Sequence, residues 1–144
     1  MDVFKKGKRS WIMSRIKGAD TAPERLVRSL IHRMGYRFRL HRKDLPGNPD
    51  IVLPRHHKII FVHGCFWHGH QNCARSKKPT TNIAFWKKKI DTNVARDRKN
   101  SRVLRKLGWD ILIIWQCELR NMSRLTAKVE RFLGETKNMR ETVI

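Results

Sequence analysis

The segment Ile59–Cys73 constrains the fold and the chemistry of this chain more than any other stretch. It begins with Ile-Ile-Phe-Val, a run of β-branched and aromatic residues that is typical of a buried strand. Three histidines, two cysteines and two adjacent aromatic residues then follow within eleven residues, interrupted by glycines. A strand that carries potential metal ligands and acid–base groups to its own end indicates a site of chemistry.

The flanking sequence predicts a helix, three strands, a helix, a strand and a helix, in that order. The first helix begins at Thr21, Pro23 and Glu24, which have the spacing of a helix cap, and Gly35 ends it. On this local pattern Glu24 is a partner in the cap. The later elements are strands at 36–40, 51–53 and 58–62, a cationic helix at 81–107 ended by Gly108, a fully buried central strand at 109–115, and a helix at 123–133 ended by Gly134. This order predicts an α/β layer fold, with a mixed sheet flanked by helices.

Asp50 is the first candidate for a functional side chain. It follows a proline and enters the strand at 51–53, which the turn at 54–57 would pair with the next strand, so Asp50 and His63 would lie at neighbouring strand ends. A turn aspartate is usually only an acceptor for backbone N–H groups. Acidic residues are rare here, with 12 Asp and Glu against 33 Lys and Arg. We therefore interpret Asp50 as a functional carboxylate that could bind Mg²⁺.

The three cysteines and one histidine could form a closed tetrahedral zinc site, made of Cys65, His70, Cys73 and Cys117. Spacing alone leaves open whether His68 or His70 is the ligand. Three cysteines cannot all pair within one chain, which favours reduced thiols in the cytosol. A closed site would be structural and would tie the loop to the last strand. The remaining histidines could then activate a water or protonate a leaving oxygen beside Asp50 and Mg²⁺, which predicts phosphodiester hydrolysis.

The net charge of +21 indicates a polyanionic partner. No apolar run approaches the roughly 20 residues of a membrane-spanning helix, and the first ten residues lack the apolar stretch of a secretory signal. We therefore expect a cytoplasmic protein that binds nucleic acid and no membrane. Residues 1–17 are basic with apolar side chains among the charges, so they are either a solvated tail or an arm that becomes ordered on DNA.

Five sequence blocks together resemble the very-short-patch repair (Vsr) DNA mismatch endonucleases. They are Pro49-Asp50, Phe61–His70, Ala84-Phe85-Trp86, Asn93–Arg98 and Gly108–Cys117, and the resemblance extends over about residues 9–120. It implies a restriction-endonuclease-like three-layer fold. It also implies a Mg²⁺-dependent enzyme that nicks duplex DNA on the 5′ side of the thymine in a T·G mismatch, which arises when 5-methylcytosine is deaminated.

The resemblance assigns roles around the metal ions. Asp50 and the backbone carbonyl of Val62 would bind Mg²⁺, His68 would be the general base, and His63 and Glu24 would support the metal and the water. Zinc would take Cys65, His70, Cys73 and Cys117. The segment between His70 and Cys73 is one residue longer than in the family pattern, and Val62 replaces a threonine.

The resemblance also assigns DNA contacts. Three aromatic side chains, those of Phe66, Trp67 and Trp86, would insert into the DNA beside the mismatch. The N-terminal arm with Met13 would reach the opposite groove. Lys89 and Asn93 are our candidates for reading the mismatched bases.

Two other functions remain open at this point. One is a catalytically silent, zinc-containing DNA-binding module that shields or bends mismatched DNA, although such a binder does not need a carboxylate that repels phosphate. The other is a restriction-type endonuclease that cuts both strands. We expect a monomer with a basic arm at 1–17, one endonuclease domain at 18–134 and a polar tail at 135–144. A mismatch-repair protein as partner is implied by the resemblance alone.

Overall fold

The computed structural model describes residues 21–143, with side chains over residues 21–134. The predicted arm at 1–17 and Met13 therefore lie outside the described residues. The helices and strands are α2 (Ala22–Arg33), β1 (Arg39–Leu40), β2 (Ile51–Leu53), β3 (Lys58–His63), α3 (Ile83–Lys106), β4 (Asp110–Trp115) and α4 (Met122–Val143). This is the predicted order of elements. In the described part, no helix combines the length and the apolar character needed to cross a bilayer.

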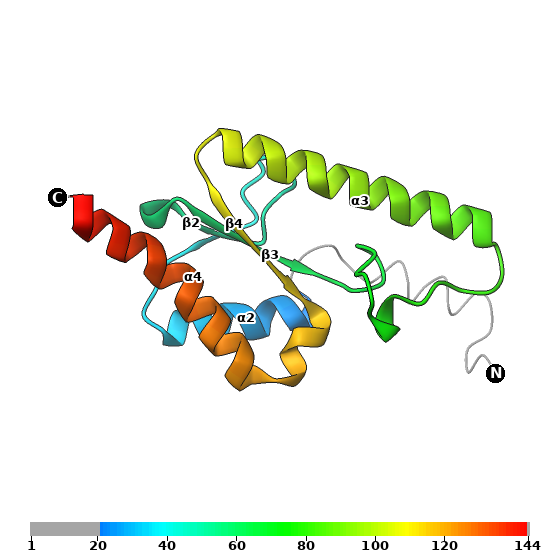
Figure 1. Ribbon diagram of the computed structural model, residues 1–144, viewed down its shortest axis with the longest axis horizontal. Helices are drawn as coiled ribbons and strands as arrows, with labels where there is room; N and C mark the ends of the chain where they lie inside the picture. Colours follow the sequence, from blue (N-terminus) through cyan, green and yellow to red (C-terminus); the bar gives the residue numbers. More distant parts are fainter. Residues whose placement is uncertain (1–20, 144) are drawn as a thin grey trace.

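The four strands form one mixed sheet in the order β1-β2-β3-β4. The first two pairs are antiparallel, and β3 and β4 are parallel. Helix α3 covers one face of the sheet, and α2 and α4 cover the other (Figure 1). The predicted α/β layer fold, with a mixed sheet between helices, is therefore confirmed.

Successive strand residues enter two separate cores, one on each face of the sheet. Ile51 of β2 packs in the core that contains Val27 of α2 and Leu125 of α4. The next residue, Val52, packs in the core that contains Leu104 of α3. Because helices cover both faces, both sets of alternate side chains are apolar, and the strands read as continuous apolar runs.

The prediction of a fully buried central strand at 109–115 is wrong. Among the described residues, β4 is an edge strand that pairs with β3 alone, and only Ile114 of its six residues is buried. The apolar run is explained by the helices on both faces of the sheet. The pattern of apolar residues in a strand shows whether its two faces are covered by other elements. It does not show whether the strand has hydrogen-bonded neighbours on both sides.

Two further boundaries differ from the sequence predictions. The strand predicted at 36–40 is reduced to Arg39–Leu40, and α4 continues past Gly134 to Val143. Gly35 and Gly108 have φ angles of +90° and +94° and end their helices, whereas Gly134 is not among the positive-φ glycines. A glycine ends a helix through its left-handed conformation, so a glycine with helical φ costs only about 1 kcal/mol within the helix.

Candidate active site and metal centre

The candidate site lies where β2 begins and β3 ends. Ile51 pairs with Ile60 in the antiparallel register, so Asp50 lies beside the C-terminal end of β3. The backbone N–H of Val62 donates a hydrogen bond of 2.7 Å to Oδ2 of Asp50. Asp50 and His63 line one cleft of about 210 Å³. The predicted placement of these two residues at neighbouring strand ends is therefore confirmed.

Glu24 faces this site from the first turn of α2. Its backbone N–H donates to Oγ1 of Thr21, as the predicted helix cap requires. Its carboxylate is buried and lies 3.2 Å from Nη2 of Arg28 and 3.1 Å from Nε2 of His41. A possible ligand atom from each of three residues lies within 4.8 Å of the other two; the residues are Glu24, His41 and Asp50. Glu24 is therefore more than a cap partner, because its side chain joins a group that could hold a cation.

The carboxyl group of Asp50 is in an environment that disfavours its charged form. Burial, with a smaller effect of the neighbouring Glu24, raises the pKa of Asp50 to about 8, while the hydrogen bond from Val62 opposes the shift. Two buried carboxylates that face each other cannot easily both be ionised. A divalent cation would replace the retained proton and relieve this repulsion.

We expect the proton on Asp50 to contribute stability that the protein, without added divalent cation, loses as the pH rises from about 4 to about 8. Below pH 6.5 the lowered pKa of His63 acts in the opposite sense, so the net loss should appear above that value. In the unfolded chain Asp50 ionises near its ordinary pKa of 3.8, whereas in the folded chain it keeps its proton up to about 8. Between these values the folded state binds one proton more, so a rise in pH favours unfolding. Urea unfolding at a series of pH values should show that the stability of the wild type, relative to that of Asp50→Asn, falls as the pH rises from about 4 to about 8. Equal slopes for the two proteins would contradict the assignment of this proton to Asp50.

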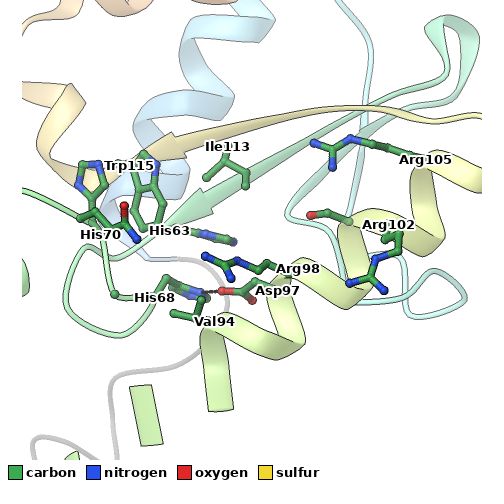
Figure 2. A pocket seen from close by; sticks show the side chains of 13 residues that line it. His63, His68, His70, Val94, Asp97, Arg98, Arg102, Arg105, Ile113 and Trp115 are labelled. Atoms are coloured by element: carbon green, nitrogen blue, oxygen red, sulfur yellow. Dashed lines mark hydrogen bonds and ion pairs between the residues drawn. The ribbon is translucent and has the colours of Figure 1, made fainter. Parts of the chain in front are cut away.

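Two histidines stack in the same cleft. The rings of His63 and His68 lie 3.8 Å apart at an angle of 8°, and Nδ1 of His68 lies 2.6 Å from Oδ2 of Asp97 (Figure 2). Burial, with a smaller effect of the neighbouring His68, lowers the pKa of His63 to about 4, while Asp97 opposes the shift. His63 is therefore neutral at physiological pH. Its Nδ1 is buried without a hydrogen-bond partner among the described residues.

Asp97 and His41 are the site residues that our sequence reasoning missed. Asp97 had a usable signal, because α3 contains only two acidic residues in 24 and Asp97 lies in the Asn93–Arg98 block. His41 had none. It follows the short strand β1 with a left-handed φ of +47°, and its contact with Glu24 depends on how the loop folds.

The predicted zinc ligands come together in a second group. One ligand atom each from Cys65, His70, Cys73 and Cys117 lie within 4.8 Å of one another. Nδ1 of His70 is 3.5 Å from Sγ of Cys117, whereas His68 faces Asp97. In tetrahedral zinc sites with Zn–S bonds of about 2.3 Å, sulfur ligands are about 3.8 Å apart. The chemistry and the spacing of these four side chains therefore fit a tetrahedral cation of this kind.

The loop after β3 carries its functional side chains against α3. The side-chain amide of Asn93 donates a hydrogen bond of 3.0 Å to the carbonyl oxygen of Trp67. Gly69 has a φ of +61°, and a Cβ atom there would lie 2.9 Å from Cγ2 of Ile90 and 3.0 Å from Cγ2 of Val94. Only glycine permits this approach without displacement of the neighbouring side chains.

The three predicted wedge residues form one partly exposed aromatic cluster. The ring of Phe66 lies 5.1 Å from that of Trp67 and 5.4 Å from that of Trp86. Phe85 is 59% exposed and contacts Trp86 at 5.2 Å. Lys89 is also exposed, about one helical turn from Trp86 on α3. The cluster thus lies at the N-terminal end of α3, where its rings are accessible to a ligand.

Comparison with known proteins then identifies the family of this chain. The sequence profile of the family described as DNA mismatch endonuclease Vsr matches residues 1–75, which is half of the chain. The chain belongs to the Vsr family. The DNA mismatch endonuclease Vsr of Escherichia coli (strain K12) is 45% identical over 125 residues, which cover 87% of this chain and 80% of that protein. The type II nicking enzyme V.XorIIP of Xanthomonas oryzae pv. oryzae is 46% identical over 126 residues, which cover 88% of this chain and 92% of that enzyme.

A solved structure supports the architecture independently. The catalytic domain of the homing endonuclease I-Bth0305I matches with a TM-score of 0.58 over 81% of this chain and 98% of that domain, at 21% identity. This likeness concerns the fold alone, and it confirms the predicted restriction-endonuclease-like class. Membership of the Vsr family makes the protein an endodeoxyribonuclease, so the predictions of family and enzyme class are also confirmed.

Proposed function

We propose that this Vsr-family protein nicks one strand of duplex DNA on the 5′ side of the thymine in a T·G mismatch that arises from 5-methylcytosine. The observation that carries the proposal is the convergence of Asp50, His63, His68 and Asp97 around one cleft of about 210 Å³. A carboxylate beside a histidine–carboxylate pair is suited to hydrolysis of a phosphodiester, because it combines a cation site with a general base. The T·G preference rests on the family.

Mg²⁺ is the cation that the Asp50 site would bind. Asp50 and the carbonyl oxygen of Val62 would be the protein ligands, with Glu24 in support, and carboxylate and carbonyl oxygens are the donors that Mg²⁺ prefers. Nδ1 of His63 is buried in the same cleft with no hydrogen-bond partner in the described part of the chain, which fits a site that is completed by a further polar group such as a bound water. When bound, the ion supplies Lewis-acid stabilisation of negative charge on the phosphate.

His68 would act as the general base, and Asp97 would position it. Nδ1 of His68 faces Asp97 at 2.6 Å, which leaves Nε2 to accept a proton from the attacking water. The carboxylate fixes the ring orientation and stabilises the imidazolium that forms, as in other histidine–carboxylate pairs. The parallel ring of His63 limits movement of His68 from one side.

The aromatic cluster would be the wedge that distorts the DNA at the mismatch. Phe66, Trp67 and Trp86 present aromatic faces at the protein surface, and insertion of such rings between base steps offsets part of the cost of unstacking. Met13 in the N-terminal arm would contact the opposite groove. Lys89 and Asn93 would read bases from α3, with Asn93 also supporting the wedge through Trp67.

Zinc would occupy Cys65, His70, Cys73 and Cys117 and would have a structural role. We further infer that one chain is sufficient for activity, because the catalytic and zinc groups all come from one chain. The enzyme would work in the cytoplasm, where its DNA substrate is located, and mismatch-repair proteins would be its protein partners. Sedimentation of the protein on a single-site duplex should give one chain per duplex, and two chains would contradict the monomer.

Nicking assays on a panel of duplexes test the proposed function. With Mg²⁺, the wild type should nick the thymine-containing strand of a T·G duplex and leave the guanine-containing strand intact. Matched T·A and C·G duplexes should be cut far more slowly. Trp67→Ala should lower the ratio of T·G to matched cleavage, because the wedge contributes to recognition. Cleavage of both strands would indicate a restriction-type enzyme, and mismatch binding without any cleavage would indicate a silent binding module.

A further inference from the structure

The stacked histidines separate two cavities. The smaller one contains Asp50, and the larger one, of about 600 Å³, lies between α3 and β4 (Figure 2). His63, His68, Asp97 and Ser101 line both. A DNA strand whose phosphate reaches the histidines continues in both directions from them. The larger cavity is open to receive the strand in one of these directions.

The larger cavity has a cationic wall. Three arginines on one face of α3, Arg98, Arg102 and Arg105, extend toward it (Figure 2). They are exposed, and neither Arg102 nor Arg105 forms an ion pair with a carboxylate in the part of the chain whose side chains are described. Asp97 is the acidic residue in the lining, and it faces His68. The cavity therefore has an excess of positive charge that no described group neutralises.

The opposite wall and the length of the cavity also suit a DNA strand. Ile113 and Trp115 of β4 supply an apolar surface against which sugars or bases could pack. Arg98 and Arg105 are seven residues apart, which is about 10.5 Å along a helix. At about 3.4 Å of duplex axis per nucleotide, this length corresponds to about three nucleotides of one strand.

We propose that the larger cavity, which we call the arginine groove, binds the phosphates of the nicked strand on one side of the scissile phosphate, over about three nucleotides. This proposal rests on the proposed function, because it places the scissile phosphate at His68. An acidic protein segment would suit the same charges. The continuity of the groove with the histidines favours DNA, since a strand held at His68 would enter the groove directly.

The test is DNA binding measured without added Mg²⁺, so that its outcome does not depend on cleavage. The variant Arg102→Gln/Arg105→Gln spares Arg98, which adjoins Asp97. The matched control is Arg124→Gln/Arg131→Gln, which removes the same charge from exposed positions on α4, across the sheet from α3. For T·G and matched duplexes alike, the groove variant should lower the magnitude of the log–log salt slope by about 1.8, or 0.9 for each lost phosphate contact. The control should leave this slope close to that of the wild type.

Neutral methylphosphonates locate the groove on the DNA. Each replaces one phosphate, at up to four positions on either side of the scissile phosphate. In the wild type, replacement should weaken binding about two- to fivefold per contact on one side only. In the groove variant the replacements that face Arg102 and Arg105 should have no effect, whereas a replacement that faces the retained Arg98 should still weaken binding. Unchanged DNA binding by the variant, equal losses in variant and control, or an unchanged methylphosphonate effect would each overturn the proposal. None of these results bears on nicking, which the duplex panel and Asp50→Asn test separately.

Discussion

Asp50→Asn should reduce the rate of nicking by at least about 10⁴-fold while mismatch affinity and zinc content remain close to those of the wild type. The asparagine oxygen can still accept the hydrogen bond from Val62, so the strand end should keep its shape. The substitution removes the negative charge that would hold Mg²⁺ and thereby removes the charge stabilisation of the scissile phosphate. Single-turnover nicking and fluorescence anisotropy on the same T·G duplex measure the two effects.

His68→Ala is the matched comparison in this experiment. It removes the proposed base but leaves the carboxylates in place, and a positioned general base contributes about 10²–10⁴-fold. Direct titration with Mn²⁺, monitored by electron paramagnetic resonance, should show a loss of cation binding in Asp50→Asn and little change in His68→Ala. If Asp50→Asn nicks at the wild-type rate, the carboxylate has no catalytic role. If His68→Ala does so, the base lies elsewhere.

The sequence was sufficient to predict the fold because local and global signals agree in this chain. The apolar runs of β2 and β3, the turn between them and the cap at Thr21 each depend on neighbouring residues alone. The error over β4 has a physical cause, since helices on both faces give an edge strand the composition of a central one. The predicted helix end at Gly134 was wrong because a glycine ends a helix only when it takes the left-handed conformation. The sequence does not show which conformation a glycine takes.

The candidate site was predictable where its residues are close in sequence or chemically distinctive. The loop from His63 to Cys73 carries most of its groups, and Asp50 was located by strand pairing. Asp97 could be noticed as one of two acidic residues in α3, but its choice over Asp91 required knowledge of which face of α3 meets the loop. The choice between His68 and His70 required the path of the loop itself. The arginine groove was hidden for a similar reason. Its basic residues were evident, but their position around one cavity with Ile113 and Trp115 of β4 depends on how α3 packs on the sheet.

Cys117 connects the loop after β3 to the end of β4, and its removal should therefore have a large structural effect. Cys65, His70 and Cys73 all lie in that loop, whereas Cys117 lies in the short 3-10 helix Gln116–Arg120 after β4. Structural zinc sites in small peptides contribute about 10–16 kcal/mol of apparent binding free energy. The two apolar cores do not include the cysteines, so the sheet should remain folded and the loss should concentrate in the loop.

We expect wild-type protein to contain about one zinc ion per chain and Cys117→Ala to contain almost none, with a melting temperature lower by more than about 10 °C. Metal analysis and calorimetry measure both quantities. Nicking should fall as well, because the loop that loses its attachment carries Trp67 and His68.

His70→Ala should reproduce the loss of zinc, whereas His68→Ala should retain the ion, since its ring faces Asp97. A folded, zinc-free Cys117→Ala protein with unchanged melting behaviour would contradict the zinc site. Zinc loss in His68→Ala with retention in His70→Ala would show that the ligand and the base are exchanged.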